Sequence, residues 1–266
     1  MARDRAGQDR RSFWEDRLDG DWTETGVGYG ALGTAFNTAM YRVRREVFLR
    51  EAGRLDLDWP HARILDIGSG TGFYVALWQQ LGAQSVTGSD LTQAAVDRLR
   101  DRFRDAQFLR LDIGDAEDVL TDGVYDAVSC IDVLFHITDD ERYASALQSI
   151  GRAVRPGGYA LLSENFVHRG VERGPNQVNR PKEWTTELLD RAGLDIVRRT
   201  PMLFLMNAQV DSPRLWRKAW GGVLRAATLT EPTGRLAAAA LTPLERRLVR
   251  SRSESPTTEL VICRRR

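Results

Sequence analysis

Short apolar runs and amphipathic stretches alternate along the chain from residue 63 onward. The apolar runs have the length and composition of buried strands, whereas the stretches between them repeat apolar residues at the three- to four-residue spacing of a helix. Strands are expected at residues 63–68, 85–90, 106–112, 125–132 and 158–164, and helices at 71–82, 92–103 and 141–158. Such alternation predicts a parallel sheet covered by helices on both faces.

Proline and glycine residues mark the ends of elements, and the pattern continues toward the C-terminus. The third helix is expected to end at the sequence RPGG, residues 155–158, because proline cannot continue a helix and glycine readily ends one. Beyond it we expect a helix at about 184–192, a strand within 195–206 and a last strand at 258–266. The chain is therefore predicted to form a doubly wound, Rossmann-like α/β fold around a mostly parallel, seven-stranded sheet.

Two segments lie outside the repeat. Residues 1–60 contain two helical stretches joined by a glycine-rich segment, which predicts an N-terminal helical cap or lid. Residues 61–266 are expected to form the main domain, with a helical insertion at about 207–257 before the last strand. The insertion has amphipathic spacing; packing against the sheet edge is favoured over roofing an apolar pocket or contacting a membrane surface.

Composition narrows the class of protein. A chain of 266 residues can bury one sizeable core, and its net charge of +1 gives no field that would attract nucleic acid or an acidic membrane. Cys130 and Cys263 stand far apart, so neither a disulfide framework nor a paired metal motif is indicated, and a cytoplasmic location is expected. No signal peptide or membrane-spanning run is visible, which leaves at most peripheral membrane contact.

The segment ILDIGSGTGFY carries the first chemical motif. Gly68, Gly70 and Gly72 follow a strand at a G-x-G-x-G spacing, which differs from the G-x-G-x-x-G fingerprint of dinucleotide-binding folds. Asp66 precedes them at the end of the strand. A pyrophosphate favours backbone donors without an adjacent carboxylate, whereas the ammonium of an amino acid needs an acceptor. The turn therefore favours a ligand that carries an ammonium group.

Two further acidic residues end the next strands. Asp90 follows the second strand, where a carboxylate can accept from ribose hydroxyls. Asp112 follows the third strand, where it can accept from the exocyclic amine of an adenine, and Ile113 can cover the face of the ring. This pattern favours an adenosine without phosphates.

The successive segments ILDIGSGTG, GSDLT, RLDIGD, YDAVSCIDVLFHI and VRPGGYALLSE resemble the motifs of class I S-adenosylmethionine-dependent methyltransferases, closest to the small-molecule group. The resemblance covers about residues 60–166, and it implies S-adenosylmethionine as cofactor and S-adenosylhomocysteine as product. It implies that the loop from Asp66 to Gly72 surrounds the methionine part and that Asp90, with Leu91 beside it, holds the ribose. Asp112 and Ile113 would then hold the adenine, and the backbone near Cys130 and Ile131 would face the ammonium.

His136 is the first candidate for a general base, because it follows the fourth strand at the carboxyl edge of the sheet. The alternative is a structural role, beside the cofactor or as a helix cap. His61 lies at the wrong end of the sheet, and His168 is a weaker candidate. Asp132 could pair with the cofactor's ammonium or cap the helix after Thr138.

Other polar and aromatic residues have open roles. Glu164, Asn165 and His168 show no spacing that marks a metal site, so no metal is expected. Tyr29 lies between glycines in the cap, where its ring could close over the methionine part. Ordinary packing is favoured for Trp14 and Trp22. Arg42, Arg44 and Arg45 are expected on a solvated helix face, although one of them could meet a carboxylate.

The predicted function is methyl transfer to an oxygen or nitrogen of a small, partly apolar metabolite, such as a natural-product, sugar or quinone-like acceptor. A nicotinamide-dependent oxidoreductase is a rival, but the glycine spacing and the absence of a Y-x-x-x-K pair oppose it. Methylation of a nucleic-acid base is a second rival, but the sequence lacks the N/D-P-P-Y/F turn by which amino-methylating enzymes hold a flipped base. A protein that binds the cofactor without methyl transfer is a further alternative. The sequence defines neither the acceptor nor the oligomeric state.

Overall fold

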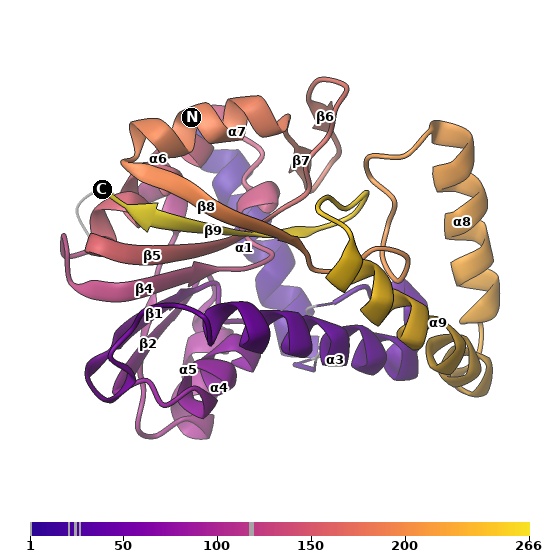
Figure 1. Cartoon of the computed structure of the whole chain (residues 1–266), viewed down its shortest axis with the longest axis horizontal. Coiled ribbons are helices and arrows are strands. Elements are labelled where there is room, and N and C mark those ends of the chain that lie inside the picture. The colour runs from indigo at the N-terminus through magenta and orange to yellow at the C-terminus, as the bar shows by residue number, and fades with distance from the viewer. Residues whose placement is uncertain (1, 21, 24–25, 27, 117–119) are drawn as a thin grey trace.

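The computed structural model describes residues 2–20, 22, 23, 26, 28–116 and 120–266, with the backbone alone for residues 2–10. A seven-stranded sheet in the order β3-β2-β1-β4-β5-β9-β8 forms its centre (Figure 1). The pairings from β3 to β5 are parallel, and β9 runs antiparallel to both of its neighbours. The predicted doubly wound, mostly parallel fold is confirmed. The strands are β1 (Arg63–Ile67), β2 (Ser85–Asp90), β3 (Gln107–Arg110), β4 (Tyr125–Cys130), β5 (Val154–Glu164), β8 (Leu194–Pro201) and β9 (Glu259–Arg265).

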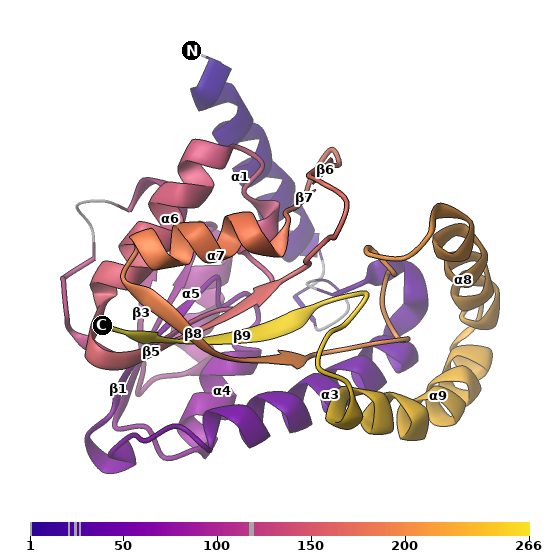
Figure 2. The same cartoon turned by 45° about the horizontal axis from the view of Figure 1, so that its top comes forward.

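Helices cover both faces of this sheet (Figures 1 and 2). Neighbouring residues of β1 face opposite cores: Ile64 joins the cluster under α3, α4 and α5, and Leu65 joins the cluster under α6 and α7. This alternation explains why Ile64 and Leu65 are both apolar although they face opposite sides of the sheet. The helices of these layers are α3 (Gly33–Ala52), α4 (Phe73–Gln80), α5 (Gln93–Arg102), α6 (Asp140–Ala153) and α7 (Lys182–Arg191), with short 3-10 turns η2 (Trp59–His61), η3 (Ile113–Asp115) and η4 (Leu134–His136).

The glycine pair after α6 has a different role from the expected one. Helix α6 already ends at Ala153, and β5 begins at Val154. The pairing with β4 then shifts from Tyr125 opposite Val154 to Ala127 opposite Tyr159, so residues 155–158 form an irregularity inside the strand. A Cβ on Gly158 would lie 2.7 Å from the carbonyl oxygen of Asp126. The prediction of a helix to residue 158 was therefore wrong, because the glycine is required by close strand packing.

The two segments outside the predicted repeat both contain helices. Helix α1 (Ala2–Gly20) packs on α5, and η1 (Gly30–Leu32) leads into α3. The insertion consists of α8 (Arg214–Ala227) and α9 (Glu231–Ser251); α9 lies along α3, and α8 stands away from the sheet (Figure 2). A small hairpin of β6 (Glu172–Arg173) and β7 (Val178–Asn179) was not predicted. None of the described helices is long and apolar enough to cross a membrane.

The topology creates a crevice between β1 and β4. From β1 the chain builds β2 and β3 on one side, and it then returns to the other side to build β4 and β5. The loops that leave β1 and β4 therefore diverge at the carboxyl edge, which is where open α/β sheets bind ligands.

Candidate active site

A glycine turn follows β1 at this crevice. Gly68, Gly70 and Gly72 have positive φ angles of 71°, 53° and 82°. A Cβ on Gly68 would lie 2.2 Å from Cγ2 of Val133, and a Cβ on Gly72 would lie 2.3 Å from the Phe103 ring. At these two positions both backbone conformation and neighbouring atoms exclude a larger residue. Gly68 and Gly70 line a cavity, whereas Gly72 forms the N-cap of α4 outside the cavity wall.

Asp66 is buried near the end of β1, next to Ile67 and Gly68, which line the cavity. Its Oδ1 accepts a hydrogen bond from the Ser129 hydroxyl, which itself accepts from the indole of Trp78. Oδ2 is buried and has no hydrogen-bond partner among the described residues. Burial raises the pKa of Asp66 to about 6, and the hydrogen bond from Ser129 opposes this rise. An unpartnered buried carboxylate oxygen is costly, so this atom suits a cationic ligand group.

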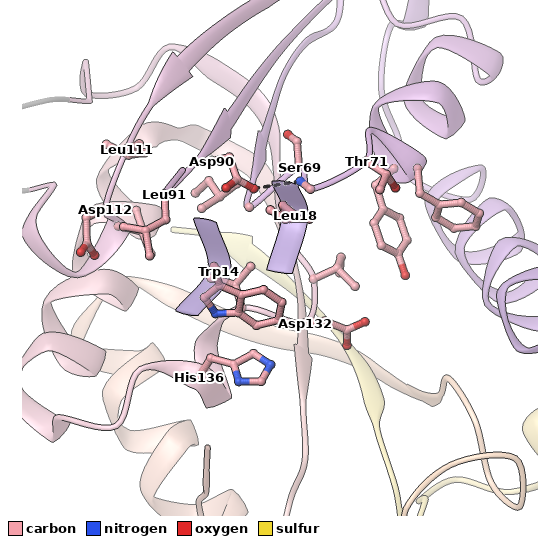
Figure 3. Close-up of a pocket in the computed structure, with 18 of the residues that line it drawn as sticks. Trp14, Leu18, Ser69, Thr71, Asp90, Leu91, Leu111, Asp112, Asp132 and His136 are labelled. Carbon is pink, nitrogen blue, oxygen red and sulfur yellow. Dashed lines mark hydrogen bonds between the residues drawn. The ribbon is translucent and has the colours of Figure 1, made fainter. Parts of the chain in front are cut away.

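Asp90 ties the glycine turn to β2. Its Oδ2 accepts from the Gly70 amide at 2.9 Å (Figure 3), and its Oδ1 accepts from the amide and hydroxyl of Thr92 at 3.0 and 2.9 Å. A carboxylate oxygen has two lone pairs, so Oδ2 retains acceptor capacity while Oδ1 is saturated. Burial raises the pKa of Asp90 above its ordinary value, and the bonds from Thr92 and Gly70 oppose this rise.

Asp112 and Ile113 lie at the far end of the same cavity wall, after β3. The Asp112 carboxylate accepts from the Gly114 amide at 3.1 Å and from Arg142 at 2.8 Å. Each of its oxygens thus has one partner and keeps one lone pair. Leu91 and Leu111 supply apolar surface around it (Figure 3), and Ile113 also lines the cavity.

The cavity encloses about 970 Å³, its open mouth included, and helix α1 forms part of its roof. Trp14 and Leu18 line it, and Figure 3 shows the Trp14 ring between Asp90 and His136. Trp22 donates from its indole to the carbonyl oxygen of Gly70 at 3.1 Å and so ties the cap to the glycine turn. Ordinary packing, which the sequence favours for both tryptophans, is therefore not their whole role. The i, i+4 spacing of Trp14 and Leu18 in a charged helix is the sequence signal for this face.

An ion pair occupies the opposite end of the cavity. Asp132 pairs with Arg44, exchanges hydrogen bonds with Ser163, and holds a left-handed φ of 59°, which is uncommon for a residue other than glycine. Arg44 is buried rather than solvated, and of Arg42, Arg44 and Arg45 it is the one that pairs with a carboxylate among the described residues. Helix α6 is capped by Asp139, which leaves Asp132 facing the cavity. The Tyr74 hydroxyl is buried nearby, without a hydrogen bond of good geometry among the described residues.

His136 lines the cavity from η4. Its Nδ1 lies 2.8 Å from the carbonyl oxygen of Asn176, and its ring meets Trp14 edge to face with centroids 5.2 Å apart. A carbonyl oxygen can only accept, so Nδ1 carries the proton and Nε2 of the neutral ring carries the lone pair. The imidazole is thus held in the tautomer that a base requires.

Other candidates lie away from this cavity. Tyr29 lies in the wall of a second cavity, because its amide and carbonyl groups both bond to the Asn37 side chain. The Cys130 side chain is buried in the core, although Ile131 lines the first cavity. His168 is exposed and pairs with Asp211. Glu164 is buried against the Tyr143 hydroxyl. No group of three potential metal-ligating side chains occurs among the described residues.

The seven-stranded sheet with an antiparallel β9, the glycine turn at the switch point and the carboxylates at the ends of β1, β2 and β3 agree with the class I methyltransferase fold that the sequence predicts. Comparison with known proteins agrees: residues 65–162 match the family described as "Methyltransferase domain".

The similar proteins cover different shares of this chain. A ubiquinone biosynthesis O-methyltransferase of Aromatoleum aromaticum is 32% identical over 131 residues, which cover 44% of this chain and 54% of that protein. The chain thus spans about half the length of this curated relative. A solved structure of magnesium protoporphyrin IX methyltransferase from Synechocystis, with bound S-adenosylhomocysteine, superposes with a TM-score of 0.55 at 15% identity. The superposition covers 96% of this chain and 98% of that chain. The [4+2]-cyclase SpnF superposes with a TM-score of 0.56 at 19% identity, covering 83% and 80%.

Proposed function

We propose that the chain transfers a methyl group from S-adenosylmethionine to an oxygen or nitrogen of a small, partly apolar metabolite. The carrying observation is one cavity that has carboxylates and apolar residues along one end and the Asp132 and His136 side chains at the other. The relative from Aromatoleum is named as an O-methyltransferase of ubiquinone biosynthesis, which supports an oxygen acceptor on a small molecule.

The residues present suit this cofactor. The unpartnered Oδ2 of Asp66 would satisfy its ammonium group, and the remaining lone pair on Oδ2 of Asp90 would accept from its ribose. Asp112 would accept from the adenine amine, with Ile113 and Leu91 against the ring and sugar. Because Oδ1 of Asp90 is saturated, we assign one ribose hydroxyl rather than two to that carboxylate.

The bound cofactor supplies an electrophilic methyl group on a sulfonium, so positioning accounts for much of the rate. The chain's own contribution is to exclude water under Trp14 and Leu18 and to hold a proton acceptor near the acceptor atom. His136 takes that role in our proposal, since Asn176 fixes its tautomer. Asp132 is committed to Arg44 and Ser163, which makes it a positioning group.

Two alternatives remain distinct from this proposal. A nicotinamide dinucleotide would bring a pyrophosphate against a turn that already has the carboxylates of Asp66 and Asp90 beside it, which is unfavourable electrostatically. The likeness to a cyclase warrants a second candidate, binding of the cofactor without methyl transfer, because fold does not determine function.

Calorimetric titration separates these functions. We expect S-adenosylmethionine and S-adenosylhomocysteine to bind and NADH not to bind. Incubation with radiolabelled S-adenosylmethionine and a panel of phenolic, amine and sugar acceptors is then expected to yield a labelled product. Preference for NADH would overturn the cofactor assignment, and binding without transfer to any acceptor would favour the non-methylating alternative.

Replacing the candidate base tests the catalytic assignment. With an acceptor from that panel, His136→Ala is expected to lower kcat by about 10²- to 10⁴-fold, with little change in cofactor affinity, because a positioned base contributes on this scale. His61→Ala is the matched control, since His61 is an exposed histidine paired with Asp58. A His136→Ala enzyme that keeps its turnover between about pH 6 and 9 would remove His136 from the proton transfer.

A further inference from the structure

A second cavity lies between helix α8 and the hairpin β6–β7. Its wall is formed by the hairpin, by the segment 207–210, by one side of α8, and by Tyr29 and Leu32 of the cap. It encloses about 1320 Å³, open solvent included. This cavity is separate from the one that holds the glycine turn, and none of the roles proposed so far uses it.

The wall of this cavity carries a strong excess of positive charge. Among the described residues that line it, five are cationic and Glu172 alone is acidic. Arg173 pairs with Asp140, and Arg217 pairs with Glu172. The side chains of the other three cations are exposed and make no hydrogen bond or ion pair with a described residue; they are Arg214, Lys218 and Arg225. Like charges gathered in a concavity raise the local potential and favour an anion.

Helix α8 places these three cations together by its period. Positions 214, 218 and 225 are separated by four and seven residues, so they share one side of the helix, and that side lines the cavity. The helix packs on the core through Trp220 and Leu224, while Leu215 is 83% exposed and Val223 is 54% exposed. A surface helix usually buries its apolar side. Apolar burial alone therefore does not account for the orientation of α8.

The two cavities adjoin the same two structural elements. On one side, His136 of the first cavity bonds to the Asn176 carbonyl, and the next residue, Gln177, lines the second cavity. On the other side, Asn37 holds the backbone of Tyr29 in the second cavity, and Tyr41, one helical turn further along α3, lines the first. The linings of the two cavities therefore follow one another at Asn176 and Gln177 and along the first turns of α3.

We propose that this cavity is an anion subsite, which binds a phosphate or carboxylate group carried by the acceptor at a distance from the methylated atom. Arg214, Lys218 and Arg225 supply the charge, and the Asn179 and Gln177 amides supply polar surface beside them. The statement that the methyl acceptor carries this anionic group rests on the proposed methyl transfer. The subsite itself depends only on the second cavity.

Equilibrium titration with inorganic pyrophosphate and with citrate at low ionic strength tests the subsite directly. The full chain is expected to bind at least one of them with one-to-one stoichiometry, and the response to each tells whether phosphate or carboxylate is preferred. A variant with Arg214→Gln, Lys218→Gln and Arg225→Gln is expected to bind at least about tenfold more weakly, because three screened charges are lost. Glu172→Gln is expected to strengthen binding several-fold, since it releases Arg217 and removes the acidic side chain.

The matched control changes three exposed arginines at the end of α9 and just beyond it, Arg247→Gln, Arg250→Gln and Arg252→Gln, which alter net charge equally and do not line the cavity. Equal weakening in both triple variants, or no saturable binding by the parent chain, would overturn the subsite. S-adenosylmethionine binding is measured in parallel on each variant. If the α8 variant loses anion binding and the parent chain does not bind S-adenosylmethionine, the subsite is supported and the proposed methyl transfer fails. If the parent chain binds S-adenosylmethionine and the α8 variant keeps its anion affinity, the subsite fails and the proposed methyl transfer is unaffected.

Discussion

Gly68→Ala is expected to destabilise the protein by about 2–5 kcal/mol and to raise the dissociation constant for S-adenosylmethionine at least about 30-fold. Gly68 has a φ of 71°, a left-handed backbone conformation that is energetically unfavourable for alanine, and the new Cβ would lie 2.2 Å from Cγ2 of Val133. Relief requires the glycine turn or the loop after β4 to move, and both line the cavity. Thermal unfolding and calorimetric titration measure the two effects.

Gly170→Ala separates the clash from the backbone cost. Gly170 also has a left-handed φ, 63°, but apart from its own atoms and its two chain neighbours no atom of the described residues lies within 4 Å of the position that a Cβ would take there. Its substitution therefore carries only the backbone penalty of about 1–2 kcal/mol. Adding Val133→Ala to Gly68→Ala removes the clashing methyl group and is expected to restore part of the affinity. If Gly68→Ala binds the cofactor as tightly as Gly170→Ala, the turn does not hold the ligand.

The sheet was predictable because its strands are buried on both faces. Ile64 and Leu65 enter different cores, so the strand has apolar residues at neighbouring positions, which distinguishes it from the amphipathic helices around it. The turn residues were less informative. The Gly157-Gly158 pair is compatible both with a helix end and with a strand irregularity, and only the close approach of Gly158 to the Asp126 carbonyl distinguishes them. The short hairpin β6–β7 has too few residues for a periodic signal.

The positions of side chains from the cap were not predictable in the same way. The three glycines and the aspartates at strand ends are ordered by the sheet itself, so their clustering follows from topology. Trp14 reaches His136, and Arg44 reaches Asp132, only through the packing of α1 and α3 on the domain. Tyr29 was expected at the first cavity because glycines flank it, but the Asn37 side chain fixes its backbone beside the second.

Binding of S-adenosylmethionine is expected to weaken about tenfold for each pH unit below about 6, because Asp66 must then be deprotonated to meet the ammonium group. The pKa of Asp66 is raised by burial to about 6 in the folded chain, against an ordinary value of 3.8. Between these values the folded state holds the proton more tightly than the unfolded state, so the ligand-free chain loses stability as pH rises from about 4 to 6, by at most about 1.4 kcal/mol per unit. Cofactor affinity changes in the opposite direction over the same range.

Two comparisons isolate the carboxylate responsible. Methylthioadenosine has the adenine, ribose and sulfur of the cofactor but no amino-acid ammonium, so its affinity is expected to change far less with pH. Asp66→Asn is expected to bind S-adenosylmethionine weakly at every pH and to lose the pH dependence. Asp90 also has a pKa raised by burial, and it faces Gly70 and Thr92. An equal pH dependence for methylthioadenosine would therefore assign the titration to Asp90 at the ribose, and it would remove Asp66 from contact with the ammonium.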